Sequence, residues 1–190
     1  GISVDEIFEL TKIDRWFLNK LKDFVGYEER LHTEKLTRAL YEEGKRLGYP
    51  DKELERLSGQ KIPYHRKAVY KMVDTCAAEF AAATPYFYST YDDPSHDEAS
   101  PFIRESRKKR IIVIGSGPIR IGQGIEFDYS SVHCVWTLKQ LGYEVIIINN
   151  NPETVSTDFD TADRLYFEPL TPEDVQNVID KEKPYGVVIT

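Results

Sequence analysis

The 190-residue sequence has only two cysteines, and none of its apolar runs approaches the roughly 20 residues that a membrane-spanning helix requires. Cys76 and Cys134 lie far apart and belong to no metal-binding or redox motif. Unpaired cysteines are typical of a reducing compartment, so we expect a cytoplasmic protein. Residues 1–10 contain three acidic and no basic side chains, which does not fit a secretory signal. The sequence predicts neither a membrane segment nor a metal site.

The sequence also lacks an excess of positive charge. Its 25 Lys and Arg are outnumbered by 32 Asp and Glu, so the net charge is −7 at pH 7. Arg104 and residues 107–110 form the one basic run, which we interpret as the solvated end of a linker. Proteins that bind nucleic acid usually carry a basic patch, and we therefore expect no nucleic-acid partner.

The first half of the chain has the apolar spacing of helices. Ser3 followed by Glu6 is a capping box ahead of the first apolar stretch. Asp14, Thr33 and Pro50 are in sequence positions typical of the beginnings of three further helices. These signals predict an all-α domain.

A fifth helix is predicted for residues 69–83, which are rich in alanine and have apolar side chains at helical spacing. The aromatic cluster at residues 86–91 is interpreted as packing against a neighbouring domain. Residues 92–107 are polar and contain two prolines, so they are predicted to be a linker. The helical domain is therefore predicted to cover residues 1–91.

Residues 108–190 alternate between predicted strands and helices, which favours a parallel sheet with right-handed crossovers. The predicted strands are residues 110–114, 144–149, 165–167 and 187–189, and the predicted helices cover residues 129–141 and a stretch beginning at Pro172. No helix follows the last strand to cover it, so we expect a domain truncated at its C-terminus. The predicted fold class is α+β in two parts: an all-α helical domain followed by a partial α/β domain with a parallel sheet.

A glycine-rich loop runs from Gly115 to Gly124, between a predicted strand and a predicted helix. Such a loop favours a phosphate group, because backbone N–H groups and the helix dipole attract anions. The dinucleotide-binding fingerprint is only half present, because Arg120 stands where its third glycine is required. The acid expected after the second strand is also missing, and residues 149–151 are asparagines instead.

The P-loop motif fails as well. Its lysine and hydroxyl are replaced by Gln123 and Gly124, which removes the phosphate cation and the magnesium ligand. Glu126 and Asp128 add two carboxylates near the start of the following helix, where they would repel a phosphate. Two roles stay open for Arg120 and Glu126: an ion pair that holds the loop in shape, or the lining of a polar passage or domain interface. The residues expected to shape the loop are Gly115, Gly117, Gly122 and Gln123.

Residues 117–129 closely resemble the opening of the second synthetase half of the carbamoyl phosphate synthetase large subunit, and so do residues 151–160 and 163–168. The helical part is similar to the same family in residues 13–17 and 73–80. The resemblance covers nearly the whole chain, although this chain is shorter than the family at residues 60–67. It implies that residues 1–91 are most of an oligomerisation domain and that residues 108–190 are a pre-ATP-grasp, Rossmann-like subdomain.

The resemblance also implies an activity for the parent protein. The family makes carbamoyl phosphate, for arginine or pyrimidine biosynthesis, from bicarbonate, ammonia and two ATP, and a small glutaminase subunit supplies the ammonia. The parent would bind ATP and Mg²⁺ or Mn²⁺ in ATP-grasp regions beyond Thr190, and other large subunits would join the assembly. This chain alone is expected to contain no catalytic residue, to bind no cofactor and to be inactive.

Arg120, Gly124 and Glu126 match positions where the family's internal tunnel passes through its second half. The resemblance therefore implies that these three residues line a tunnel for a labile intermediate, or an interface beside it. Two alternatives are a dinucleotide-binding module, based on Gly115 and Gly117, and a purely structural oligomerisation module.

Overall fold

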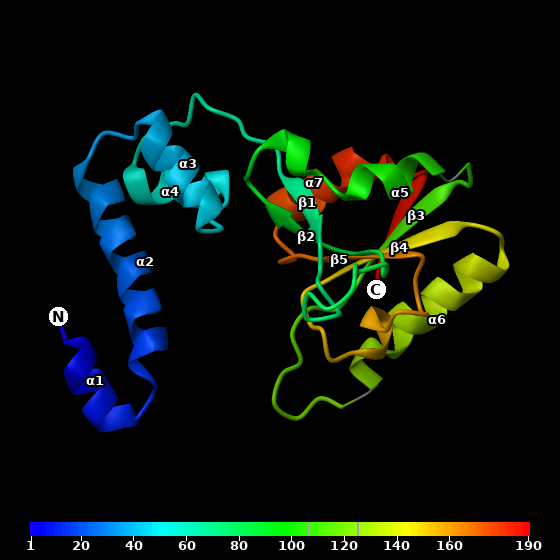
Figure 1. The fold of residues 1–190 in the computed structure, drawn as a ribbon, viewed down its shortest axis with the longest axis horizontal. Helices are drawn as coiled ribbons and strands as arrows, with labels where there is room; N and C mark the ends of the chain where they lie inside the picture. Colours follow the sequence, from blue (N-terminus) through cyan, green and yellow to red (C-terminus); the bar gives the residue numbers. More distant parts are fainter. Residues whose placement is uncertain (106, 125) are drawn as a thin grey trace. The chain divides into compact units, whose positions relative to one another are not determined.

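The computed structural model describes residues 1–105, 107–124 and 126–190, and the side chain of Glu105 is not described. The chain forms two compact units, Gly1–Arg66 and Lys67–Thr190 (Figure 1). Within the predicted linker at residues 92–107, Ser106 lies outside the described residues, as does Ile125 within the segment 117–129.

The first unit is helical, as predicted. It consists of α1 (Val4–Thr11), α2 (Arg15–Thr33), α3 (Arg38–Arg46) and α4 (Asp51–Ser58). The capping box of Ser3 and Glu6 is confirmed, and the Asp14 side chain accepts the Trp16 N–H at the start of α2. The predicted cap at Thr33 is wrong. Thr33 is the last residue of α2 and donates its hydroxyl to the Glu29 carbonyl, whereas Thr37 caps α3.

The core of the helical unit lies between α2, α3 and α4. The Tyr27 side chain extends into this core, and its hydroxyl donates a hydrogen bond of 2.8 Å to the Leu40 carbonyl. Gly44 on α3 leaves the space that this ring occupies, because a Cβ at residue 44 would come within 2.1 Å of the Tyr27 hydroxyl oxygen. The other buried apolar residues are Leu31, Leu36, Leu40, Tyr41, Leu54 and Leu57.

The second unit is built on a six-stranded sheet in the order β1-β2-β5-β4-β3-β6. Strands β3 to β6 run parallel, as predicted, and β2, which was not predicted as a strand, pairs parallel with β5 and antiparallel with β1. The strands are β1 (Val69–Met72), β2 (Tyr86–Thr90), β3 (Arg110–Ile114), β4 (Glu144–Asn149), β5 (Arg164–Phe167) and β6 (Gly186–Ile189). The helices are η1 (Pro94–His96), α5 (Ala99–Glu105), α6 (Glu126–Gln140), η2 (Val155–Thr157) and α7 (Pro172–Glu182).

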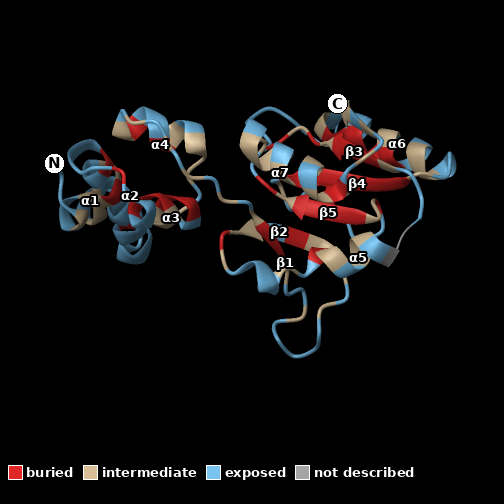
Figure 2. Cartoon of the chain, turned by 90° about the horizontal axis from the view of Figure 1, so that it is seen from above, coloured by how far each residue is buried: buried red, intermediate tan, exposed pale blue. Residues whose placement is uncertain are grey.

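Helices cover both faces of the sheet, with α5 and α7 on one face and α6 on the other (Figure 1). Alternate residues of β4 serve the two cores: Ile146 and Ile148 face α5 and α7, whereas Val145 and Ile147 face α6. Figure 2 shows the resulting band of buried residues along the central strands. Near-continuous apolar strands are therefore explained by burial on both faces.

The predicted helix at residues 69–83 is wrong. Residues 69–72 form β1, which pairs with β2 through the partners Val69–Thr90 and Met72–Phe87. The alanine-rich stretch after β1 is not helical, and Ala77 and Ala78 both have positive φ angles. Pairing with β2 has overridden local helix propensity here, and residues 67–91 belong to the sheet unit. Residues 92–105 also differ from a free linker, because they include η1 and α5 and Ala99 is fully buried.

Candidate functional site

The glycine-rich loop lies at the carboxyl edge of the sheet. Because β3, β4 and β5 are parallel, the segments that follow them emerge at one edge. The loop at residues 115–124 follows β3, and the polar segment at residues 150–163 follows β4. This edge is where ligand sites occur in open parallel sheets, so the chemistry of the loop decides what the edge can bind.

Asn149, at the end of β4, holds the first part of the loop. Its side chain is fully buried, and its Oδ1 accepts the N–H of Gly117 at 3.2 Å and that of Asn150 at 2.9 Å. Its Nδ2 donates to the Ser156 hydroxyl at 3.4 Å. Gly115 packs directly on this side chain, and Gly117 has a φ of +81°, a left-handed conformation that favours glycine. Two of the glycines expected to shape the loop thus have physical reasons for being glycine.

The middle of the loop is closed by its own side chains. Gln123 Oε1 accepts the Arg120 N–H at 2.8 Å, and the Arg120 carbonyl accepts the Gln123 N–H at 3.0 Å. Gly122 lies within this turn and has a φ of +91°. The Glu126 carboxylate accepts the Gly124 N–H at 3.0 Å, and this backbone hydrogen bond lowers the pKa of Glu126. The Glu126 carboxylate therefore occupies the place at the Gly124 N–H where a bound anion would otherwise lie.

The structure does not bring the charged groups of Arg120 and Glu126 together. Both residues are exposed, and the ion pairs found in the described parts of the chain do not join them. Glu126 instead bonds to the backbone of the loop. Of the two roles left open by the sequence, an ion pair that fixes the loop is the one that this geometry disfavours.

Asp128 joins the two segments at the carboxyl edge. It is buried in the first turn of α6, and its Oδ2 accepts the Ser156 N–H at 2.5 Å. Hydroxyls of Thr154, Ser156 and Thr157 form a buried cluster around this point. Sequence reasoning treated Asp128 as a carboxylate that repels phosphate and Asn149 as a missing acid. In the structure both are buried residues that anchor the loop. This role depends on the fold, which brings Asp128 and Ser156 into contact although they are 28 positions apart.

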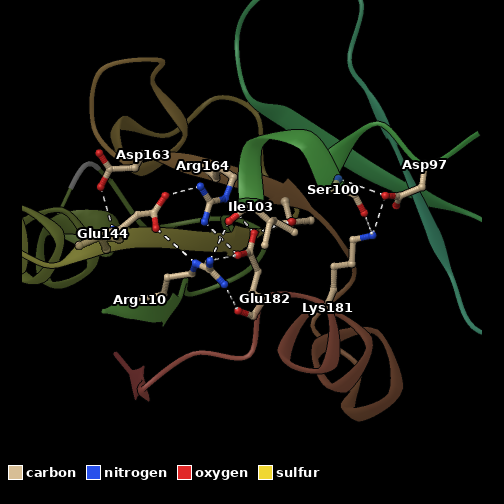
Figure 3. A network of polar contacts seen from close by, with 11 residues as sticks. Asp97, Ser100, Ile103, Arg110, Glu144, Asp163, Arg164, Lys181 and Glu182 are labelled. Atoms are coloured by element: carbon tan, nitrogen blue, oxygen red, sulfur yellow. Dashed lines mark hydrogen bonds and ion pairs between the residues drawn. The ribbon is translucent and has the colours of Figure 1, made fainter. Parts of the chain in front are cut away.

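A second polar network lies at the opposite, amino edge of the sheet (Figure 3). The Arg164 guanidinium bonds to both oxygens of Glu182, at 2.8 and 2.9 Å, and also to Glu144. Arg110 donates to the Glu182 carbonyl at 2.6 Å, and the Tyr166 hydroxyl donates to the Glu182 carboxylate at 2.6 Å. Glu182 is fully buried, so this network joins α7 to β3, β4 and β5 rather than facing a ligand.

Neither a metal cluster nor a membrane helix occurs in the part of the chain that the structure describes. Residues 1–105, 107–124 and 126–190 contain no group of three or more His, Cys, Asp or Glu placed to hold a metal ion. Their helices are too short or too polar to cross a membrane.

Two segments of the chain match known protein families. Residues 1–76 match the oligomerisation domain of the carbamoyl-phosphate synthetase large chain. Residues 107–190 match the carbamoyl phosphate synthase preATP-grasp domain. These two matches follow each other along the chain and fall mainly on the helical unit and on the sheet unit.

Curated relatives are similar over the whole of this chain. The carbamoyl phosphate synthase large chains of Lachnoclostridium phytofermentans, Methanosarcina barkeri and Thermotoga maritima are 52%, 54% and 52% identical to it, across 100% of its residues. The chain spans 18% of the length of each of these relatives. From the two matches and this identity, the chain belongs to the carbamoyl phosphate synthase large-chain family.

Proposed function

We propose that this chain is a non-catalytic part of a glutamine-dependent carbamoyl phosphate synthase, in which it supplies assembly surface and part of the passage for the reaction intermediate. The parent would be an ATP-dependent ligase that uses bicarbonate, ammonia and two ATP. Support comes from relatives at 52–54% identity that are named carbamoyl phosphate synthase large chains. We further propose that the helical unit belongs to assembly and the sheet unit to the second synthetase half.

One observation carries the non-catalytic part of this proposal: three N–H groups of the glycine-rich loop are already bonded to side chains. Gly117 donates to Asn149, Arg120 donates to Gln123, and Gly124 donates to Glu126. A phosphate cradle requires such N–H groups to point at the ligand. We therefore place the ATP and Mg²⁺ or Mn²⁺ sites of the parent outside these 190 residues.

The tunnel proposal rests on the exposed part of the loop. Arg120, Gly124 and Glu126 are exposed at the carboxyl edge, so this part of the loop is open to whatever the parent places there. Gly124 has no side chain to block a passage, and the Glu126 carboxylate provides a polar wall held by the Gly124 N–H. Carbamate decomposes in water, so an enclosed polar route would protect it.

The assembly proposal rests on apolar side chains exposed on α1 and α2. Trp16 and Phe17 expose 61% and 58% of their surface and contact each other edge to face, with ring centroids 4.9 Å apart. Exposed apolar patches are typical of protein–protein contacts. The other exposed apolar residues of α1, α2 and the turn between them are Leu10, Ile13, Leu21, Phe24 and Val25.

The remaining properties of the parent follow from the same proposal. A large chain implies a small glutaminase subunit as partner, and other large subunits would bind through the assembly surface. The free cysteines Cys76 and Cys134 support a reducing compartment, and we place the protein in the cytoplasm. Arginine or pyrimidine biosynthesis would consume the product.

The tunnel is tested in the full-length enzyme with a size series at residue 124. We expect Gly124→Leu to leave glutamine hydrolysis intact but to uncouple it from carbamoyl phosphate formation. Gly124→Ala is the matched control. Its Cβ would meet only the end of the flexible Glu126 side chain, at 2.7 Å, so we expect normal coupling. Unchanged coupling in Gly124→Leu would rule out the tunnel role.

The non-catalytic role is tested by calorimetry with ATP and Mg²⁺ on the 190-residue chain. Because the loop N–H groups are already bonded, we expect no binding in the micromolar range. Micromolar binding would contradict the proposal and would favour a nucleotide site at the loop.

A further inference from the structure

The Glu168 carboxyl group joins two elements that are far apart in the sequence. Glu168 directly follows β5, and only 1% of its surface is exposed. Its Oε1 accepts the Ser89 N–H at 2.5 Å, and its Oε2 bonds to the Ser89 hydroxyl at 2.7 Å. Ser89 lies on β2, so one side chain satisfies both polar groups of a residue in the neighbouring strand.

These bonds occur where the backbone ladder between β2 and β5 has ended. The two strands pair at Tyr86–Leu165 and Phe87–Tyr166. Ser89 lies two residues further along β2, and Glu168 takes over the role of a backbone acceptor there. Since β1 pairs with β2 alone, this short ladder and Glu168 provide the polar attachment of the β1–β2 hairpin to β5, beside the buried ring contacts of Tyr70 and Phe87 with Tyr166.

The surroundings of Glu168 disfavour a negative charge. Asp174 on α7 brings a second carboxylate near it, and the Tyr70 hydroxyl on β1 is buried nearby without a hydrogen-bond partner among the described residues. The carboxyl group bonds to neutral groups of Ser89 on β2, and the backbone N–H of Glu168 donates to the Asn149 carbonyl at the end of β4. Burial raises the pKa of Glu168 to about 7, although the bonds from Ser89 oppose this rise.

Two further titratable groups act on Tyr70: Tyr91, which follows β2, and Asp97, which follows η1. Lys71 on β1 pairs with Asp92, and Glu98 accepts the Met72 N–H. Lys181 on α7 is already engaged, because it pairs with Asp97 at 2.6 Å and with the Ser100 hydroxyl at 2.8 Å (Figure 3). Among the residues that the structure describes, ionised Glu168 is therefore left with hydrogen bonds but without a counter-ion.

We propose that Glu168 is a pH-sensitive switch that holds the β1–β2 hairpin on the sheet as a neutral acid and releases it in part when it ionises. The neutral acid keeps both bonds to Ser89, because one oxygen accepts the N–H while the protonated oxygen donates to the hydroxyl, which is itself the donor to the ionised form. The ionised form buries a charge beside Asp174, and opening of the hairpin would return that charge to water. The inference does not depend on the proposed function.

The sign follows from the two protonation equilibria. The pKa of Glu168 is raised from 4.5 to about 7 in the folded chain. An acid with a raised pKa stabilises the closed hairpin fully at low pH, and this stability is lost as the pH rises from about 4.5 to about 7. We expect the protection of hairpin amides against hydrogen exchange, corrected for intrinsic rates, to fall on the order of a hundredfold between about pH 5 and pH 8.

The test is residue-resolved amide exchange on the 190-residue chain and on two variants. Glu168→Gln keeps the acceptor for the Ser89 N–H and a donor for its hydroxyl but cannot ionise, so we expect high protection that no longer depends on pH. Ser89→Ala removes only the hydroxyl bond, so protection should be lower but still pH-dependent. The β4 amides serve as an internal control and should keep their protection.

Two results would overturn the inference. One is hairpin protection in the unsubstituted 190-residue chain that does not change between pH 5 and pH 8. The other is a pH dependence that persists in Glu168→Gln. If the Gln variant does not fold, carbon-13 NMR titration of the Glu168 carboxyl in the unsubstituted 190-residue chain decides the question. A midpoint near neutral pH supports the switch, whereas a midpoint below pH 5 excludes it.

Discussion

The Asn149 side chain lies so close to the Cα of Gly115 that a Cβ at residue 115 would come within 2.6 Å of the Asn149 Cγ. Both residues are near the carboxyl ends of adjacent parallel strands, where the Gly115 N–H still donates to the Ile148 carbonyl at 2.9 Å. Gly115 is required here by close packing and not by a left-handed conformation. The start of the loop is therefore set by the contact between these two strands.

Gly115→Ala should destabilise the sheet unit by about 2 kcal/mol, because Asn149 is fully buried and its hydrogen bonds would have to shift. Urea unfolding in a Trp16→Phe background measures this, since Trp136 fluorescence then reports the sheet unit alone. Gly186→Ala is the matched control. A Cβ there meets nothing within 4 Å, so we expect a change below about 0.5 kcal/mol.

Asn149→Ala should cost about 2 kcal/mol, because the buried N–H of Gly117 loses its acceptor. The double variant Gly115→Ala/Asn149→Ala should cost less than the sum of the two single changes, since alanine at residue 149 removes the atoms that a methyl group at residue 115 would strike. The same unfolding measurement completes the cycle. Strict additivity would mean that the two residues do not interact.

Local signals in the sequence predicted much of the fold. The helix starts at Ser3 and Asp14 depend on side chains that bond to N–H groups two or three residues away, so the pattern is complete within a short segment. The helix predicted for residues 69–83 was wrong for the opposite reason. The strand partner of residues 69–72 begins 14 residues after Met72, and the alanines between them have high helix propensity that the structure does not use.

The candidate site shows the same division. The loop itself could be predicted, because its glycines lie between a predicted strand and a predicted helix. The anchoring by Asn149 and Asp128 could not be predicted, and neither could the bonds between Glu168 and Ser89, which are 79 positions apart. A buried polar residue has no sequence signature unless its partner is known.

Glu182→Ala should destabilise the sheet unit by about 3–5 kcal/mol, because it leaves the buried Arg164 guanidinium without its main partner. Trp136 fluorescence during urea unfolding again provides the measurement. Lys71→Ala is the control for an ion pair in the same unit. Its bond to Asp92 is solvent-exposed, so its loss should cost much less than the loss of Glu182. Equal losses in the two variants would show that burial does not set the strength of the network.

Gly44→Ala and Gly26→Ala should have opposite effects on the helical unit. Both glycines are inside helices, where alanine is intrinsically better by about 1 kcal/mol. At residue 26 a Cβ meets nothing within 4 Å, so we expect Gly26→Ala to stabilise the unit by up to this amount. At residue 44 the Cβ would strike the Tyr27 hydroxyl and Leu54, so we expect a loss of about 3 kcal/mol and of the Tyr27–Leu40 hydrogen bond. Residue-resolved amide exchange in α2 and α3 measures both changes. If both variants were stabilised, helix propensity and not packing would control this core.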